Sequence, residues 1–184
     1  FRLVLGAQAA LLGDDFAFLQ EVLLPQPEVR HAVGLEPEAD LQAIGGEVLK
    51  FIGDGLLAII PIVECADLKE ACDKALTAAE QALANMDALN VERAAAWLEA
   101  LGLSITLHVG AVIFGNIGAP ERLDFTVIGP AVNLAFRIDH LAKVLSCRLL
   151  MSDDFARAAD RPLRSLGFHA LRGIREPHEL FTLP

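Results

Sequence analysis

The stretch Leu123–Ile138, LDFTVIGPAVNLAFRI, predicts a strand, a tight turn and a helix in immediate succession. An apolar run that contains Thr126 breaks at Gly129-Pro130, and proline suits the first turn of a helix because its missing N–H would have no partner there. In the helical pattern that follows, Asn133 and Arg137 are four residues apart, which places both side chains on one face, about one turn apart. The stretch therefore predicts an amide and a guanidinium side by side, either as a ligand-binding pair or as an ordinary polar stripe on a solvated helix.

A second pattern, upstream of the first, predicts a β-hairpin. Two short apolar segments, Val48–Ile52 and Leu56–Ile60, flank Gly53-Asp54-Gly55, which has the composition and spacing of a tight turn. The hairpin would carry the Asp54 carboxylate at its tip and Lys50 on one of its strands. Taken alone, Asp54 is better explained as a turn residue selected for its backbone preference.

The remaining segments predict helices and strands that pack around these two motifs. Helical patterns cover Asp14–Leu23, Asp67–Met86, Asn90–Leu101, Ala131–Leu145 and a short helix after Ser152. Strand patterns cover Ser104–Phe114, which leads into a glycine turn at 115–118, Cys147–Met151, and two segments between Leu166 and Leu183 that turn at 172–178. The segment Leu3–Leu12 fits a strand or a buried helix. Trp97 is expected in the core, and His108 is expected to be a buried strand histidine rather than a ligand.

The composition indicates a globular protein with its own core. The chain has 184 residues, is 54% apolar and 22% charged, and carries a formal net charge of −10, without the dense Lys/Arg run expected of a nucleic-acid or anionic-lipid binder. Cys65, Cys72 and Cys147 form no paired framework and no metal-ligand spacing, so we expect reduced thiols and a cytoplasmic location. No apolar run is long enough to span a membrane. Because the chain begins at Phe1, we expect a C-terminal module of a longer protein, with any membrane anchor upstream.

Three motifs in order resemble the catalytic domain of class III nucleotide cyclases, the adenylate and guanylate cyclases. They are KFIGDG at 50–55, HVGAVIFGNIG at 108–118 and RLDFTVIGPAVNLAFRI at 122–138. The resemblance implies an α+β fold of the class III cyclase, ferredoxin-like type, with a mainly antiparallel central sheet and helices packed on it. It implies one catalytic domain over residues 1–184, with a cyclase-like core at 44–184 and an N-terminal part, 1–43, that matches the family poorly.

The resemblance also assigns roles to the substrate-binding residues. Lys50 resembles the lysine that reads adenine, and Thr126 resembles its partner. Asn133 resembles the residue that orients the ribose, and Arg137 the one that stabilises charge on the reacting phosphate. An ammonium group can only donate hydrogen bonds, which suits the N1 acceptor of adenine and not the N1–H donor of guanine.

Further residues would bind the triphosphate and the metal ions. Arg172 matches a basic residue of the family that contacts the triphosphate, and Arg122 is a weaker candidate for the same task. Two divalent ions, Mg²⁺ or Mn²⁺, are implied. Asp54 resembles one of their aspartate ligands, and the other is best matched by Asp14, with Asp15 as a competitor.

The sequence thus predicts an adenylate cyclase that converts ATP into 3′,5′-cyclic AMP and pyrophosphate. The family resemblance implies a head-to-tail homodimer in which Lys50, Asp54 and Thr126 of one subunit face Asn133 and Arg137 of the other. An upstream sensor or membrane domain is expected, and a nucleic-acid partner is not. Two alternatives remain open: a guanylate cyclase, and a degenerate domain that only dimerises or binds nucleotide.

Overall fold

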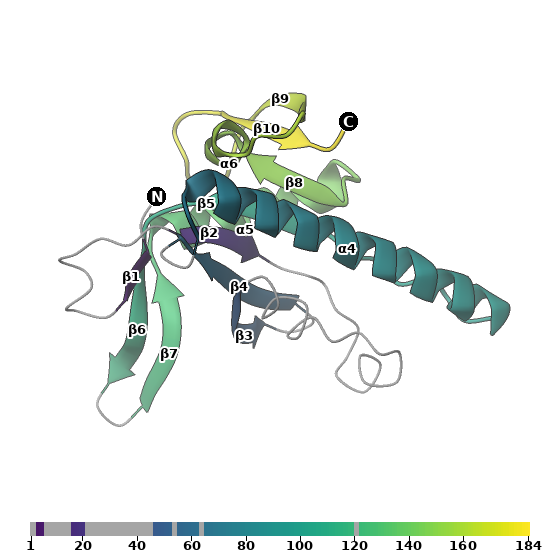
Figure 1. Ribbon diagram of the computed structural model, residues 1–184, viewed down its shortest axis with the longest axis horizontal. Coiled ribbons are helices and arrows are strands. Elements are labelled where there is room, and N and C mark those ends of the chain that lie inside the picture. The colour runs from purple at the N-terminus through teal and green to yellow at the C-terminus, as the bar shows by residue number, and fades with distance from the viewer. Residues whose placement is uncertain (1–2, 6–15, 21–45, 53–54, 63–64, 120–121) are drawn as a thin grey trace.

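The computed structural model describes residues 3–5, 16–20, 46–52, 55–62, 65–119 and 122–184. In these residues the chain forms two β-sheets with helices packed on the larger one (Figure 1). The elements, in chain order, are β1 (Leu3–Leu5), β2 (Phe16–Gln20), β3 (Glu47–Ile52), β4 (Gly55–Pro61), α4 (Leu68–Ala95), β5 (Ile105–Val109), β6 (Val112–Ala119), β7 (Arg122–Ile128), α5 (Pro130–Val144), β8 (Leu149–Ser152), α6 (Asp153–Ala158), β9 (Arg164–His169) and β10 (His178–Thr182).

The larger sheet has seven strands in the order β3-β4-β2-β5-β8-β10-β9. All neighbouring strands are antiparallel except β5 and β8, which run parallel. A smaller sheet, in the order β1-β6-β7, contains the antiparallel β6–β7 hairpin and the parallel pair β1–β6. The expected α+β fold with a mainly antiparallel central sheet is confirmed.

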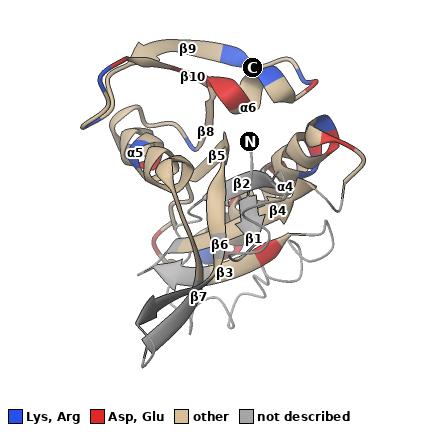
Figure 2. Ribbon diagram, turned by 90° about the vertical axis from the view of Figure 1, so that its left-hand side faces the viewer, with Lys and Arg blue, Asp and Glu red and all other residues tan. Residues whose placement is uncertain are grey.

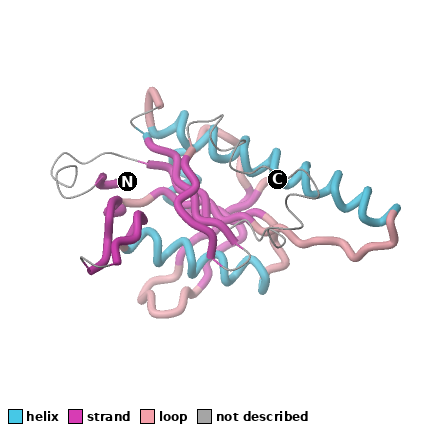
Figure 3. Tube along the Cα trace, turned by 90° about the horizontal axis from the view of Figure 1, so that it is seen from below, coloured by secondary structure: helices cyan, strands magenta, loops and turns pink. Residues whose placement is uncertain are grey.

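The core lies on both faces of the larger sheet, because its strands alternate their side chains between two helical layers. On β4, Leu56, Ala58 and Ile60 pack in the cluster formed with α4 and α6, whereas Leu57 and Ile59 pack in the cluster formed with α5. Figure 3 shows helices on both sides of the sheet. Each fully buried large aliphatic side chain contributes about 1.5–3 kcal/mol to this packing.

The predicted β-hairpin and the predicted strand-turn-helix are both confirmed. Strands β3 and β4 pair until Ile52 lies opposite Gly55, and α5 begins at Pro130 directly after β7. The short helix α6 starts as expected, with the Ser152 hydroxyl accepting a hydrogen bond from the Phe155 N–H at 3.2 Å. The two strands of the tail are β9 and β10. Within the described residues, none of the helices combines the length and hydropathy needed to cross a bilayer.

The predicted helix at Asp14–Leu23 is wrong for its described part. Phe16–Gln20 is β2, a central strand that pairs with β4 on one side and β5 on the other. The aspartates before this segment are of the residue type that is typical of a helix N-terminus. A strand with neighbours on both edges can, however, pair its backbone N–H and C=O groups within the sheet. Tertiary pairing therefore overrides the local signal.

The predicted break in the long helix and the predicted burial of Trp97 are also wrong. Helix α4 runs for 28 residues, to Ala95, and its C-terminal part extends beyond the sheet (Figure 1). Trp97 follows the end of the helix with a φ of +59° and is 96% exposed. The Asn90 side chain bonds both backbone groups of Leu101 and ties the following segment back to the helix. This end of α4 extends past the core, which agrees with the exposure of Trp97.

The segment Ser104–Phe114 is two strands rather than one. Strand β5 ends at Val109 and β6 begins at Val112, so the glycines at 115 and 118 lie within β6 and not in a turn. His108, in β5, is buried as expected, and its Nδ1 lies 2.8 Å from the Ser152 hydroxyl. Burial lowers the pKa of His108 to about 3, because desolvation disfavours the charged imidazolium.

Candidate active site

The start of α5 is held against the connection between β5 and β6. Gly129 has a φ of +151°, and a Cβ at this position would lie 3.0 Å from the Ala111 carbonyl oxygen and 3.3 Å from the Val112 Cα. Only glycine fits such a close backbone approach without displacement. Pro130 then occupies the first turn, and the Asn133 N–H donates to the Gly129 carbonyl at 3.3 Å. This joint fixes where the polar face of α5 points.

Helix α5 divides into a buried face and a polar face. Ala131, Ala135 and Ile138 pack into the clusters beneath the helix, which leaves Asn133 exposed and Arg137 half-buried on the other side. The sequence pattern predicted this division, because the apolar and polar positions each recur at helical spacing.

The polar face of α5 lines an open pocket of about 680 Å³, which we call the α5 pocket. Its other wall is the connection between β9 and β10, which lies beside α5 in Figure 2. A Cβ built on Gly173 would lie 3.6 Å from Nη2 of Arg137, so the backbone of this connection passes close to the guanidinium. The lining residues are Asn133, Phe136, Arg137, His140, Leu141, Ala170, Leu171, Arg172 and Gly173.

The connection between β9 and β10 is anchored on the side that faces the core. Leu171 is buried and shares a hydrophobic cluster with Ile138 of α5, and its carbonyl accepts from the Ile174 N–H at 3.0 Å. Gly173, with a φ of +73°, allows the chain to turn at this point. Arg172 is consequently exposed at the pocket, so the structure brings Asn133, Arg137 and Arg172 together.

The basic side chains of the α5 pocket have no acidic partners in the described part of the chain. Neither Arg137 nor Arg172 forms a side-chain hydrogen bond or ion pair there, and the amide of Asn133 is equally unengaged. The protein has a net charge of −10, yet these two guanidinium groups at one pocket have no carboxylate partner among the described residues. Guanidinium groups bind phosphate and carboxylate oxygens through paired N–H donors, so the pocket is suited to an anionic ligand.

Thr126 is not among the described residues that line this pocket; it lies on β7, which contacts β3, the strand that carries Lys50. Thr126 is only 5% exposed, and its buried hydroxyl has no hydrogen-bond partner within the described residues. Lys50 lies opposite Leu57 in the β3–β4 ladder, and its side chain is outside the described part. Leu49 of β3 packs against the cluster that contains Val127 of β7, so the strands carrying Lys50 and Thr126 are close together.

The predicted metal ligands are Asp54 and Asp14, with Asp15 as a competitor, and all three lie outside the described residues. Arg122 lies opposite Ala119 in the β6–β7 ladder, but its side chain is also outside the described part. Among the side chains that the structure does describe, no group of three or more His, Cys, Asp or Glu residues could hold a metal ion. The carboxylate donors assigned from the sequence are of the type that Mg²⁺ prefers.

The residues that line the α5 pocket and that the sequence did not single out include Phe136, His140 and Leu141. A helical-wheel projection could have found His140, because it follows Asn133 by seven residues and therefore shares its face. The hydrogen bond between the His140 Nδ1 and the Phe136 carbonyl, at 2.9 Å, orients the imidazole. Gly173 could not have been recognised as a contact of Arg137 from sequence spacing.

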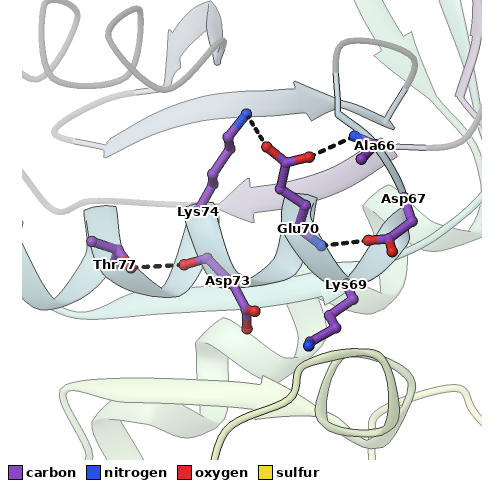
Figure 4. A pocket seen from close by; sticks show the side chains of 7 residues that line it. All are labelled: Ala66, Asp67, Lys69, Glu70, Asp73, Lys74 and Thr77. Atoms are coloured by element: carbon purple, nitrogen blue, oxygen red, sulfur yellow. Dashed lines mark hydrogen bonds and ion pairs between the residues drawn. The ribbon is translucent and has the colours of Figure 1, made fainter.

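A second pocket, of about 500 Å³, lies at the N-terminal end of α4, and we call it the α4 pocket (Figure 4). Asp67 caps the helix by accepting from the Glu70 N–H at 2.8 Å, and the Glu70 carboxylate accepts from the Ala66 N–H at 2.5 Å. Lys74 pairs with Glu70 at 3.0 Å, and Lys69 pairs with Asp160 of the segment after α6 at 2.7 Å. These side chains hold the helix start in place.

Two pKa shifts follow from this arrangement. The backbone hydrogen bond from Ala66, and then the ammonium of Lys74, lower the pKa of Glu70. The side-chain hydrogen bond and the charge of Asp160 raise the pKa of Lys69. On the buried face of the same helix, desolvation raises the pKa of the Cys72 thiol to about 12, so this thiol stays protonated.

Comparison with known proteins identifies related sequences. A family model described as the adenylate and guanylate cyclase catalytic domain matches residues 40–161. An uncharacterized protein of Mycobacterium tuberculosis is 37% identical over 139 residues, which are 73% of this chain and 23% of that protein. An adenylate cyclase of Anabaena cylindrica is 34% identical over 122 residues, covering 64% of this chain and 23% of that protein. The chain thus spans about a quarter of the length of these relatives.

Among solved structures, the adenylyl cyclase CyaB from P. aeruginosa superimposes with a TM-score of 0.76. The match covers 91% of this chain and 92% of that chain at 19% sequence identity. At this identity the likeness concerns the fold, and it agrees with the arrangement of sheet and helices described above.

Proposed function

Because the chain belongs to the family of adenylate and guanylate cyclase catalytic domains, we propose that it is an adenylate cyclase that converts ATP into 3′,5′-cyclic AMP and pyrophosphate. The observation that carries the proposal is the α5 pocket, which Asn133, Arg137 and Arg172 line together without side-chain hydrogen bonds or ion pairs in the described part of the chain. Their types and order match the ribose-orienting, phosphate-stabilising and triphosphate-binding residues of the family.

The reaction needs both positioning and charge stabilisation. The 3′-oxygen of ATP loses its proton and forms a bond to the α-phosphorus, while the bond from this phosphorus to the bridging oxygen of the β-phosphate breaks. Arg137 would stabilise the negative charge that develops on the α-phosphate, as a fixed donor that needs no reorganisation. Asn133 would hold the ribose so that the 3′-oxygen faces the phosphorus, and Arg172 would bind the departing phosphates. When bound, two divalent ions, Mg²⁺ or Mn²⁺, supply activation of the 3′-oxygen and neutralisation of the polyphosphate.

Asp54 and a second carboxylate would hold these ions. Asp54 directly precedes Gly55, the first residue of β4, and the chemistry of its carboxylate fits the role. Asp14 is the second ligand proposed from the sequence. Strand β2 begins at Phe16, which lies opposite Pro61 at the far end of β4, six residues or about 20 Å from Gly55.

The opposite end of β2 offers an alternative ligand. Gln20 lies opposite Leu57, two residues from Gly55, and the next residue in the sequence is Glu21. Titrating the activity of Asp14→Asn and Glu21→Gln with Mn²⁺ decides between the two carboxylates. The variant that has lost a ligand needs a much higher Mn²⁺ concentration for half-maximal activity, whereas the other titrates like the wild type.

Lys50 and Thr126 would select adenine. Their strands contact each other, and the buried hydroxyl of Thr126 is without a partner in the described residues, which supports a role in binding a polar ligand. Leaving a buried hydroxyl unpaired costs about 1–3 kcal/mol, and a hydrogen bond to the base would remove that cost. Arg122 remains a weaker proposal for the triphosphate.

The active site would be shared between two copies of the chain. Asn133 and Arg137 line the α5 pocket beside the β9–β10 connection, whereas Lys50 belongs to β3, at the opposite edge of the larger sheet, which supports a composite site completed by a second subunit. Ile113 and Ile128 lie opposite each other on the β6–β7 hairpin and are 48% and 44% exposed, so this hairpin carries apolar surface that a partner could cover. An upstream sensor or membrane domain is likewise a proposal.

The decisive experiment measures cyclic AMP and cyclic GMP formation by the purified chain with ATP or GTP, in Mg²⁺ and in Mn²⁺. The proposal expects cyclic AMP from ATP, at a rate that rises more than linearly with protein concentration as dimers form. Preferential production of cyclic GMP would establish a guanylate cyclase instead, a possibility that the family includes. Binding of nucleotide without any product would establish a degenerate domain.

A further inference from the structure

His140 belongs to the same face of α5 as Asn133 and Arg137, and it lines the same pocket. It is one turn beyond Arg137, about 4.5 Å further along the helix axis, and about 10 Å beyond Asn133. None of the roles proposed above uses this residue. Its position extends the row of polar side chains toward the end of the pocket that lies away from the ribose-binding amide.

The hydrogen bond of His140 to the backbone determines which ring nitrogen is available. Its Nδ1 lies 2.9 Å from the Phe136 carbonyl oxygen, and a carbonyl oxygen can only accept, so Nδ1 carries a proton in this contact. Nε2 is then the remaining polar atom of the imidazole. A neutral ring with a protonated Nδ1 presents an Nε2 lone pair, which would repel a phosphate oxygen. Only after Nε2 takes up a proton can it donate to an anion.

From this geometry we infer that His140 binds the β- and γ-phosphates, and then the leaving pyrophosphate, in a contact that requires uptake of one proton at Nε2. The inference rests on the proposed function, in which Asn133 holds the ribose and Arg137 the α-phosphate. The next turn of the helix then faces the part of the polyphosphate that leaves. Proton release from His140 weakens the contact, so the residue couples pyrophosphate dissociation to pH.

The charged groups around His140 set the sign of this coupling. Arg137 of α5 and Arg172 of the β9–β10 connection line the same pocket and are the described cations that face it together with His140. Asp139 is adjacent in sequence but is buried, and the side chain of Lys143 lies outside the described part. A polyphosphate bound in this pocket would bring negative charges to Nε2, and these favour a proton on that atom.

The test compares His140→Gln with the wild type by calorimetric titration of the full chain with inorganic pyrophosphate and with tripolyphosphate. We expect the variant to bind about tenfold more weakly at about pH 6, and within about twofold of the wild type at about pH 8, because histidine changes charge in this interval. Taking the ratio of the dissociation constants of the two proteins at each pH cancels the titration of the phosphates themselves. His140→Arg, which carries a permanent cation, should bind as tightly as the wild type at pH 6 and more tightly at pH 8.

His169→Gln is a matched control, because His169 also bonds a backbone carbonyl, that of Leu166, but lies on β9 and does not line the pocket. It should leave both titrations unchanged. In turnover with ATP, His140→Gln should raise KM at pH 6 by a similar factor and change kcat by less than about twofold.

The outcomes separate this inference from the proposed function. The role of His140 is overturned if the ratio of the dissociation constants of His140→Gln and the wild type is the same at both pH values, or if it is near one at pH 6. A wild-type chain that makes no cyclic nucleotide overturns the proposed function, and the binding ratios still decide whether His140 is a proton-linked phosphate ligand.

Discussion

The α5 pocket and the α4 pocket each contain two long basic side chains, but only those of the α4 pocket are paired with carboxylates in the described residues. In the α4 pocket, Lys69 pairs with Asp160 and Lys74 pairs with Glu70, whose carboxylate also accepts a backbone hydrogen bond. In the α5 pocket, Arg137 and Arg172 have no such partners within the described residues. Both pockets are open to solvent and similar in volume, about 500 and 680 Å³.

The difference shows that pairing, rather than the presence of charge, separates a structural cluster from a candidate site. Side chains that satisfy one another hold a helix end and have little left to offer a ligand. Unpaired guanidinium groups beside a cavity repel each other, so they destabilise the empty fold slightly and gain most when an anion binds. The comparison predicts that changes in the α5 pocket affect activity and changes in the α4 pocket affect stability.

The largest effect is expected from Arg137→Ala. Loss of one preorganised donor at a developing anion costs about 3 kcal/mol, which lowers kcat by about a hundredfold or more. The melting temperature should not fall, because Arg137 has no partner to lose in the described structure. The matched control is Lys74→Ala, which removes a cation from the α4 pocket and should leave kcat unchanged. Equal losses of activity in the two variants would contradict the distinction between the α5 pocket and the α4 pocket.

The same variant tests whether the site is shared between subunits. Asp54→Asn removes the proposed metal charge and should be inactive for a different reason. In a heterodimer of Arg137→Ala and Asp54→Asn, one site collects both lesions and the other collects neither. Activity should return on mixing, to at most about half of the wild-type value per heterodimer. If subunit exchange is demonstrated and the mixture stays inactive, the composite site is wrong.

A smaller effect is expected from Lys50→Glu, which changes base selection outside the α5 pocket. A carboxylate accepts hydrogen bonds from guanine N1–H and N2–H₂, so ATP turnover should fall and the preference for ATP over GTP should weaken by about tenfold. The ratio of kcat/KM for the two nucleotides is the measurement. An unchanged ratio would place base selection elsewhere, and altered binding of pyrophosphate would mean that Lys50 also contacts the phosphates.

Local chemistry explains what could be predicted from the sequence. The joint at Gly129-Pro130, the cap at Ser152 and the polar face of α5 each depend on a few neighbouring residues, and all three are present in the structure. The placing of Arg172 at the same pocket as Arg137 depends on the path of the chain between β9 and β10. No spacing in the sequence contains that information, and only the family resemblance pointed to Arg172.

The failed predictions depended on the surroundings of a segment rather than on its own residues. Phe16–Gln20 is a strand because β4 and β5 lie on its two edges, and Trp97 is exposed because α4 extends beyond the sheet. The spacing of His140 from Asn133 places both residues on one face of α5, but the sequence gives no sign of the pocket that His140 lines.

The α4 pocket can be tested through its contribution to the stability of the fold. Asp67→Ala removes the side chain that caps α4, and loss of such a cap costs about 1 kcal/mol. For a chain of this size the melting temperature should fall by about 2–4 °C. The kcat should remain that of the wild type, because the α4 pocket has no part in the proposed reaction. Differential scanning calorimetry and the cyclase assay check the two halves of the prediction, and a variant with normal stability and reduced kcat would contradict both.

The smallest effect is expected from Glu70→Gln, and it appears only in acid. The pKa of Glu70 is lowered in the folded state from its ordinary value of 4.5, first by the Ala66 N–H and then by Lys74. A carboxyl group with a lowered folded-state pKa stabilises the fold above its unfolded-state pKa, and this contribution is lost as the pH falls through the folded-state value. The melting temperature of the wild type should therefore drop below about pH 4.5. The Gln variant, which has no proton to take up, should show a shallower drop over the same interval.

The measurement is a series of thermal melts between neutral and acidic pH, with Glu92→Gln, an exposed change near the other end of α4, as the control. If the two Gln variants follow the same acid profile, the hydrogen bonds of Glu70 do not stabilise the start of α4, and pairing alone would no longer explain why the α4 pocket is structural.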